Sequence, residues 1–282
     1  MKYTFVSLGK MESFGYRLGG AGLGNILFPW ATALVYAKKH DLKRIQTTWK
    51  NFKIGPFLRK ERDKRMYFDL FTGKDGIGGF KKFFLLNFSS KVKYFSRMDD
   101  LFEPFKNEQA FVKQELLKII NPYHLQKANE FDANSIGVHI RMGDFENPEN
   151  EQILRDGAWN YRLPMKWYLN IIAKLREQTN LPIYIFSDAN DEDLQEILQL
   201  KNCKREFFGS AISDMIALSK CKVLVSSSST FSMWACFLGQ MPTIWFPGQM
   251  RHKLLTNINI FEGEIDYHDS LPNSIIETIT NG

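Results

Sequence analysis

The segment Val138-His139-Ile140-Arg141-Met142-Gly143-Asp144-Phe145 decides the fold class, because it ends an apolar, strand-like run with three ionisable side chains. Parallel α/β sheets bind their ligands outside the carboxyl ends of the strands, where such side chains emerge. Side-chain alternation puts His139 and Arg141 on the same face of the strand end. An arginine at this position offers a permanently charged fork that matches phosphate oxygens, and it is costly to bury unpaired. The segment therefore predicts an anionic ligand.

Two more loops with polar or small residues border apolar runs. Gly19 to Asn25 lies between a strand-like and a helix-like pattern, and its small residues let the backbone approach a ligand closely. Residues 225–232 form a hydroxyl-rich loop before another helix-like pattern, where backbone N–H groups can hold phosphate oxygens. Capping of the helix explains one serine of this loop but not four. Both loops are therefore candidate phosphate-binding segments.

Alternating apolar patterns predict an α/β chain whose C-terminal half is a doubly wound parallel sheet. Residues 41–130 are less regular, and the hinge between the halves is expected near residues 121–134, so the predicted domains are 1–130 and 131–282. The expected strands span residues 3–8, 136–140, 183–187, 223–225 and 242–246, and the expected helices span residues 25–40, 107–120, 165–178, 191–200, 211–220 and 231–238.

Four motifs together resemble the fucosyltransferase superfamily, most closely the bacterial α-1,2-fucosyltransferases of glycosyltransferase family 11. That family carries a GGLGNQ-like loop, an HxRRGDY-like segment, an FSDD-like strand end and an NSTFSWWA-like loop. The counterparts, in the same order, are residues 22–25, 139–145, 186–189 and 228–235, so the resemblance covers most of the chain. It implies a GT-B (glycosyltransferase B) fold with two Rossmann-like halves facing a cleft. Residues 1–130, with the glycine-rich loop, would be the acceptor-side domain, and residues 131–282 the nucleotide-sugar-binding domain.

The resemblance also implies roles for individual residues. Arg141 would bind the β-phosphate of GDP-fucose and neutralise charge as the diphosphate leaves. His139 would contact the nucleotide, and Asp144 would orient Arg141 or lie close to the acceptor. Asp188 would either accept hydrogen bonds from the guanine edge or cap the following helix. The expected catalytic residues are Arg141, Asp144 and His139, and the expected donor-binding residues are Gly22, Gly24, Asn25, His139, Arg141, Asp188, Ser228, Ser229 and Thr230.

The implied reaction is an inverting transfer of L-fucose from GDP-β-L-fucose to a hydroxyl, with O2 of a terminal galactose in a surface glycan as the favoured acceptor. Such an enzyme is a galactoside α-1,2-fucosyltransferase of the hexosyltransferase class EC 2.4.1. No cofactor and no metal are expected, because no DxD-like pair stands in a suitable loop and Arg141 with helix-end amides can offset the diphosphate charge. Asp144 and Glu146 are the nearest carboxylates for a general base, and the sequence does not choose between them.

Two departures from the family pattern leave alternatives open. Ile26 stands where the family has a glutamine, and Met142 stands where it has a second arginine. These changes motivate one alternative, an inverting glycosyltransferase that uses a different nucleotide sugar. The other alternative is a noncatalytic protein that binds nucleotide sugars or glycans.

The charge distribution bears on the partners. The net charge of +6 suits an anionic nucleotide, an anionic membrane surface or nucleic acid. Basic residues concentrate between residues 38 and 118 and alternate with aromatic ones, so this region is either solvated lysine over an aromatic core or a surface that rests on anionic lipid headgroups. A nucleic-acid role is not expected, because no recognised module accompanies the charge. The predicted partners are therefore a nucleotide sugar, a glycan acceptor that includes lipid-linked forms, and a membrane surface.

Cysteine usage and hydropathy bear on the compartment. The three cysteines show no CxxC or metal-type spacing, and two of them lie in apolar runs, which predicts buried thiols in a reducing compartment. No run approaches the roughly 20 apolar residues of a membrane span, and the apolar part of the N-terminus is too short for a secretory signal. The sequence thus predicts a cytoplasmic protein, peripheral at the inner face of the bacterial plasma membrane where it works on lipid-linked acceptors for O-antigen or capsule.

Overall fold

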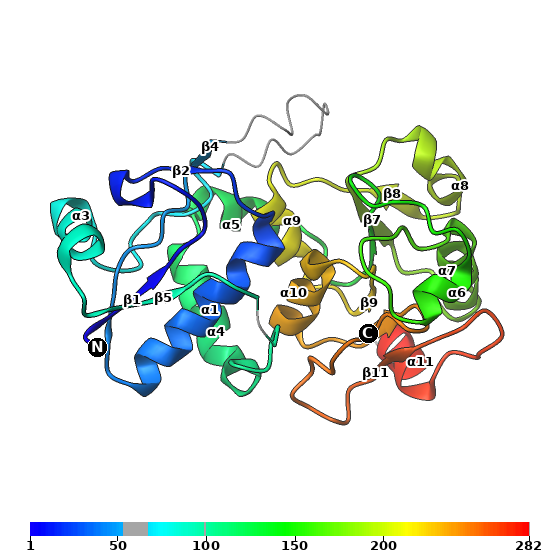
Figure 1. Cartoon of the computed structure of the whole chain (residues 1–282). Helices are drawn as coiled ribbons and strands as arrows, with labels where there is room; N and C mark the ends of the chain where they lie inside the picture. Colours follow the sequence, from blue (N-terminus) through cyan, green and yellow to red (C-terminus); the bar gives the residue numbers. More distant parts are fainter. Residues whose placement is uncertain (53–66, 99, 282) are drawn as a thin grey trace. The chain divides into compact units, whose positions relative to one another are not determined.

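The computed structural model describes residues 1–52, 67–98 and 100–281, and the chain divides into two compact units (Figure 1). Unit 1 comprises Met1–Gln126 and unit 2 comprises Lys127–Gly282. The boundary predicted between residues 130 and 131 lies a few residues further along the chain. The acceptor-side and nucleotide-sugar-binding roles given to the two halves remain predictions.

Unit 1 is built on a parallel sheet of three strands in the order β3-β1-β5. Helix α1 packs against β1 and β5, and its apolar stripe of Leu27, Trp30 and Leu34 is buried. The bounds are β1 Tyr3–Val6, η1 Glu12–Phe14, β2 Arg17–Leu18, α1 Leu23–Lys39, β3 Lys43–Arg44, β4 Asn51–Phe52, α3 Gly79–Phe88, β5 Val92–Phe95, η2 Lys106–Glu108 and α4 Gln109–Ile119. Helix α5 (Pro122–Asn129) spans the division between the units.

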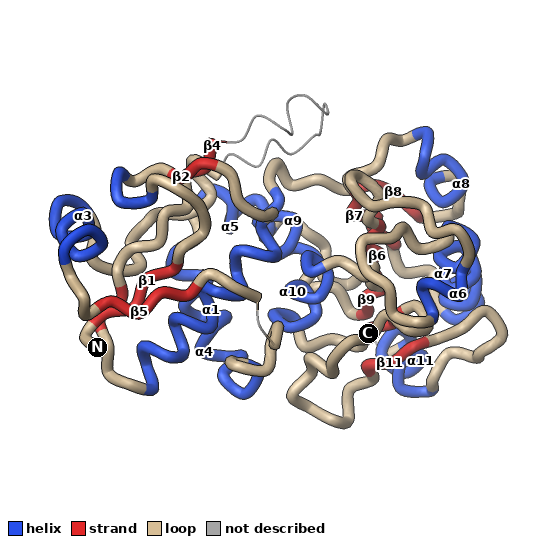
Figure 2. The backbone as a smooth tube through the Cα atoms, in the orientation of Figure 1, coloured by secondary structure: helices blue, strands red, loops and turns tan. Residues whose placement is uncertain are grey.

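Unit 2 is built on a parallel sheet of six strands in the order β11-β10-β9-β6-β7-β8 (Figure 2). Strand β6 lies inside the sheet between β9 and β7, and all five of its residues are buried. The bounds are β6 Ile136–Ile140, α6 Glu151–Arg155, α7 Met165–Gln178, β7 Ile183–Ser187, η3 Glu192–Leu194, α8 Gln195–Leu198, β8 Cys203–Arg205, α9 Ala211–Leu218, β9 Val223–Val225, α10 Thr230–Gly239, β10 Thr243–Trp245, β11 Glu262–Glu264 and α11 Asn273–Thr280.

The two faces of the large sheet are covered by different helices. Ile136, Val138 and Ile140 of β6 join one core cluster with the apolar stripes of α7 and α11. Gly137 points the other way, toward Leu218 of α9. Helices on both faces of a parallel sheet are the doubly wound arrangement that the sequence predicts, and that prediction is confirmed.

The chain changes direction in the sheet at β6. After β6 it adds β7 and β8 on one side, and it then returns to place β9, β10 and β11 on the other side. Neighbouring strands β6 and β9 therefore leave their crossover connections on opposite sides, an arrangement that in doubly wound sheets forms a crevice beyond the carboxyl ends. This topological switch point is the place where doubly wound sheets bind their ligands.

Several predicted elements have the predicted bounds, notably residues 136–140, 165–178, 183–187 and 223–225. The helix predicted over residues 25–40 begins earlier, at Leu23, because extended Gly22 is its N-cap; Asn25 therefore does not cap it. The helix predicted over residues 191–200 is instead a 3₁₀ turn followed by a short α8. Strands β8 and β11 were not predicted, because three residues are too few for a periodic signal.

Close packing of β6 against α9 leads to a stability prediction. A Cβ atom at Gly137 would lie 2.6 Å from Cδ1 of Leu218 and 2.9 Å from Sγ of Cys221, both in a buried layer. We expect Gly137→Ala to lower the free energy of unfolding by about 1–3 kcal/mol in urea denaturation, because the layer must shift to admit the methyl group. The matched control is Gly22→Ala, where φ is −69° and a Cβ atom meets nothing within 4 Å. Equal stability of the two variants would contradict this account.

Candidate functional site

A hydrogen bond joins the two strands that form the switch point. His139 Nδ1 lies 2.8 Å from Oγ of Ser227, which follows β9. The Ser227 hydroxyl lies 3.1 Å from Ser232 Oγ and accepts from the backbone N–H of Ser229 at 3.2 Å. The imidazole stacks on Phe231 of α10, with ring centroids 4.9 Å apart. The end of β6, the serine loop and the start of α10 thus form one connected polar layer.

Burial determines the charge state of His139. The side chain is buried, and this burial lowers the pKa of the imidazole to about 3, with the nearby Asp188 raising it and Arg141 lowering it by smaller amounts. His139 is therefore a neutral ring at physiological pH. Because it can donate from one nitrogen and accept at the other, it serves as a hydrogen-bonding group and not as a source of positive charge.

Arg141 supplies the positive charge of the site. Its guanidinium pairs with Asp144, and Nη1 lies 2.7 Å from Oδ2 of Asp188. The other oxygen of Asp188 accepts from the backbone N–H of Met142 at 2.8 Å, so this carboxylate holds both the end of β6 and the arginine. The Arg141 and Asp144 side chains keep 21% and 41% of their surface exposed. A ligand can therefore reach the charged group.

Two further details fix the position of Arg141. A Cβ atom at Gly143 would collide with the Asp188 carboxylate, so only glycine allows this close approach. Arg162 donates from Nε to the carbonyl oxygens of Phe145 at 2.9 Å and Met142 at 3.2 Å, and it thereby holds both ends of the turn that carries Asp144. These contacts hold the turn from both ends, which favours a preorganised position of the Arg141 charge.

The serine loop divides its side chains between internal and outward positions. Ser229 is the N-cap of α10, and its hydroxyl accepts from the backbone N–H of Phe231 at 3.1 Å. Ser226 and Ser227 are buried, whereas Ser228 and Thr230 are half-buried. Of the three predicted phosphate-binding hydroxyls, Ser229 thus has a structural task, and Ser228 and Thr230 are the ones nearer to solvent. The N-terminal amides of this ten-residue helix provide a favourable end for an anion.

The glycine loop of residues 19–25 belongs to unit 1. Gly19 and Gly20 have φ angles of 75° and 106°, and a Cβ atom at Gly20 would lie 2.6 Å from the carbonyl oxygen of Leu8. The buried Arg17 donates from Nη1 to the Gly19 carbonyl at 2.8 Å. Glycine is therefore required for the turn, and Gly22, Gly24 and Asn25 follow it at the start of α1. The donor-binding role of these three residues remains a prediction.

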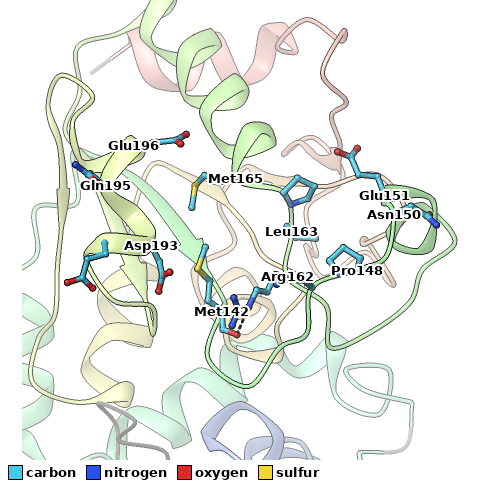
Figure 3. Close-up of a pocket in the computed structure, with 13 residues that line it drawn as sticks. Met142, Pro148, Asn150, Glu151, Arg162, Leu163, Met165, Asp193, Gln195 and Glu196 are labelled. Atoms are coloured by element: carbon cyan, nitrogen blue, oxygen red, sulfur yellow. Dashed lines mark hydrogen bonds between the residues drawn. The ribbon is translucent and has the colours of Figure 1, made fainter.

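A cavity of about 520 Å³ lies beside Met142 in unit 2 (Figure 3). One wall carries Asp193, Gln195 and Glu196, and the other carries Arg162 and the Pro148 to Glu151 turn. Met142 itself packs against the core cluster and offers no donor group. The carboxylates of Asp193 and Glu196 would repel a diphosphate, so the cavity does not suit the phosphates of a nucleotide sugar.

In residues 1–52, 67–98 and 100–281, no group of three His, Cys, Asp or Glu side chains is placed to hold a metal ion. Within the same ranges, no helix combines the length and the apolar character needed to cross a membrane.

Comparison with known proteins identifies the family. The model of the family described as "Glycosyl transferase family 11" matches residues 23–248, which include the strand-end segment and the serine loop. The chain belongs to glycosyl transferase family 11. It is 30% identical over 162 residues to the O-antigen biosynthesis glycosyltransferase WbnK of Escherichia coli. That match covers 51% of this chain and 50% of WbnK, so it spans about half the length of this relative.

Solved structures agree on the fold. A mutant of FUT1 from Arabidopsis thaliana, in complex with GDP, is 14% identical with a TM-score of 0.50, over 91% of this chain and 72% of that one. POFUT1 in complex with GDP is 12% identical with a TM-score of 0.49, over 86% of this chain and 98% of that one. The likeness to FUT1 concerns the fold alone, and the predicted GT-B type α/β fold is confirmed.

Some site residues were missed by sequence reasoning. Ser227, Phe231 and Arg162 contact the predicted residues His139 and the Met142 to Phe145 turn. Ser227 and Phe231 lie inside the hydroxyl-rich loop of residues 225–232, so the signal was present but did not single them out. Arg162 lies outside any motif, and only the folded chain brings it to the turn.

The buried, neutral state of His139 can be measured by NMR. We expect one histidine ring, which is absent from spectra of His139→Phe, to show no titration between pH 5 and pH 8. Because the folded pKa lies below the unfolded value, the stabilisation is complete above about pH 6.5 and is lost as pH falls from there toward 3. The thermal midpoint of the wild type should therefore drop more steeply below pH 6 than that of His139→Phe. Parallel pH profiles would contradict the assignment.

Proposed function

We propose that the protein transfers L-fucose from GDP-β-L-fucose to a hydroxyl of a surface glycan, with inversion at the sugar carbon. The observation that carries this proposal is the position of Arg141, which is paired with Asp144 and Asp188 beside the β6–β9 switch point. Family membership supports sugar transfer, and the GDP in the FUT1 and POFUT1 structures supports a guanine nucleotide. The name of WbnK supports an acceptor in O-antigen synthesis.

The proposed chemistry follows from the charges at the site. In a single displacement, the acceptor oxygen attacks the sugar carbon while the bond from that carbon to the β-phosphate oxygen breaks. Charge grows on the departing diphosphate, and the Arg141 guanidinium, held by Asp188, can stabilise it without reorganisation. The acceptor hydroxyl gives its proton to a carboxylate, for which Asp144 and Glu146 are the candidates on the adjacent turn. No metal is part of the proposal, because Arg141 and the α10 amides supply the counter-charge.

The nucleotide would contact the polar layer around His139. The neutral imidazole offers hydrogen bonds to the nucleotide, and Ser228, Thr230 and the N-terminal amides of α10 offer hydrogen bonds to phosphate oxygens. Both oxygens of Asp188 already accept hydrogen bonds from the β6 end. These contacts favour a positioning role for Asp188, and a bond to the guanine edge has to use the remaining lone pairs of the same carboxylate.

A different nucleotide sugar is the second candidate, favoured by the half-buried Met142 in place of an arginine. Calorimetric titration of GDP, UDP, dTDP and GDP-fucose separates the two, with and without EDTA. Selective binding of GDP and GDP-fucose, unchanged by EDTA, supports the main proposal. Selective binding of UDP or dTDP would retain the glycosyltransferase and discard fucose.

Substitution of Arg141 tests the proposed catalytic role. We expect Arg141→Ala to lower fucose turnover by about a hundredfold or more, because loss of one fixed transition-state donor has an effect of that size. Arg141→Lys retains the charge but loses the two N–H donors that can bind an anion side by side. Its turnover should therefore lie between those of the wild type and Arg141→Ala. Radiolabelled transfer to a galactoside measures the rates, and urea denaturation checks that both variants fold. Near-normal turnover of Arg141→Ala would remove Arg141 from the mechanism.

We also infer that unit 1 docks on an anionic membrane surface through α3. Phe80, Phe84 and Phe88 lie four residues apart on this helix, and Phe80 and Phe88 are 77% and 73% exposed. Their rings are contiguous, with centroids 5.0 Å apart for the first pair and 5.4 Å for the second. Large exposed aromatic patches of this kind mark interaction surfaces.

The charge around α3 favours a lipid surface as its partner. Residues 76–98 contain five basic residues and no acidic one, and Lys81 and Lys91 are exposed. Lysines beside an apolar helix face match anionic headgroups, with each contributing on the order of 1 kcal/mol. This surface is part of the basic, aromatic region recognised in the sequence, of which residues 53–66 lie outside the described residues.

A vesicle experiment tests the α3 surface. We expect the wild type to sediment with vesicles of 30% phosphatidylglycerol, and replacement of Phe80, Phe84 and Phe88 by serine to weaken binding about tenfold or more. The control is Tyr123→Ser, an exposed aromatic of α5. Binding that is equal in the triple variant and the wild type contradicts the inference, as does a concentration-dependent dimer in sedimentation velocity that the triple variant abolishes.

A further inference from the structure

A second cavity of unit 2, of about 480 Å³, lies on the side of the turn that carries Asp144. Its lining combines two carboxylates, one amide and three aromatic side chains, from Asp144, Phe145, Glu146, Trp159, Asn160 and Tyr161. The Asp144 carboxylate that faces this cavity also pairs with Arg141. The cavity therefore adjoins the charged group to which the leaving diphosphate is assigned.

Trp159 presents a flat apolar surface to this cavity. The guanidinium of Arg251 covers one face of the indole, with Cζ 3.3 Å from the ring centroid, yet the side chain stays 43% exposed. The exposed surface therefore belongs to the other face and the ring edge. An open indole face beside polar groups offers a stacking surface for a ligand.

The turn that carries Trp159 is fixed from behind. The buried Gln249 donates from Nε2 to the carbonyls of Leu154 at 2.5 Å and Ala158 at 3.3 Å. Arg251 donates to the carbonyl of Gly157 at 3.1 Å. Side chains of the loop after β10 thus hold the carbonyl groups before Trp159, and Arg251 also packs on the indole itself.

The backbone that carries Glu146 is bonded to the segment that follows Trp159. The backbone N–H of Glu146 donates to the carbonyl of Asn160 at 3.0 Å, and the N–H of Arg162 donates to the carbonyl of Glu146 at 2.9 Å. This short parallel bridge pairs Glu146 with Tyr161. One cavity is therefore lined by an aromatic ring and by two carboxylates that can accept hydrogen bonds from hydroxyl groups.

We propose that the cavity formed by Asp144, Glu146 and Trp159 binds the terminal sugar of the acceptor glycan. A pyranose has an apolar face of C–H groups, which packs on an aromatic ring, and hydroxyls at its rim, which donate to carboxylates. A diphosphate does not fit, because two carboxylates would repel it. The inference rests on the proposed function, since it names the acceptor side of the same site. It makes Trp159 a residue for acceptor recognition with no part in donor binding.

The test separates acceptor binding from donor binding. We compare wild type, Trp159→Ala and Trp159→Phe with lactose and methyl β-galactoside as acceptors, and titrate each protein with GDP. Trp159→Ala should raise the acceptor KM about tenfold or more and change kcat less, because it removes the stacking surface. Trp159→Phe keeps an aromatic face and should recover most of the affinity. The Kd of GDP should stay within about twofold in both variants.

Each result points one way. An unchanged acceptor KM in Trp159→Ala overturns the proposal, and so does an equal loss of GDP and acceptor binding, which indicates a structural role. If the wild type transfers no fucose, the proposed donor is wrong, but saturation-transfer NMR still tests the subsite. Galactoside signals that are present with wild type and lost with Trp159→Ala support the sugar site independently of the donor, and their presence in both proteins contradicts it.

Discussion

Strand β6 is buried along its whole length and ends in ionisable side chains, and the rest of the site follows from this constraint. An arginine or histidine that is buried without a hydrogen-bond partner destabilises the fold, and the net free energy of unfolding of a domain is small. The structure meets this cost with Asp188 from the end of β7, Asp144 from the turn after β6, and Ser227 from the loop after β9. The partners come from three neighbouring segments at the carboxyl edge of one sheet.

The same pairs that stabilise the strand end also prepare it for an anion. Asp188 is bound to both the backbone of Met142 and the guanidinium of Arg141, so it holds the arginine in place. Asp144 is the more exposed partner, so in the proposed reaction the diphosphate would take its place beside Arg141 while the contact to Asp188 stays. His139, neutral through burial, adds hydrogen-bonding capacity without adding charge. The division between fixed and exchangeable partners is what a site for a leaving anion needs.

The loops around this edge place different chemistry on its two sides. Arg162 anchors the turn between Met142 and Phe145, and cavities lie on both sides of it. The one beside Met142 has carboxylates and amides on its walls, and the one beside Asp144 has a tryptophan platform fixed by Arg251. A single rigid turn thus connects the positive charge to a surface suited to a sugar ring.

Local periodicity and motifs of a few residues were enough to predict the alternation of strands and helices in unit 2, the polar ends of β6, β7 and β9, and the family. The sequence also placed Arg141, Asp144, Asp188 and the serine loop among the candidates. The folded chain is needed to show which of them meet: β9 pairs with β6, Asp188 forms an ion pair with Arg141, and Ser229 caps α10. Strand order depends on long-range burial and crossover geometry, which no local pattern encodes. For the same reason Arg162, Gln249 and Trp159, remote from any motif, emerged as parts of the site only in the folded chain.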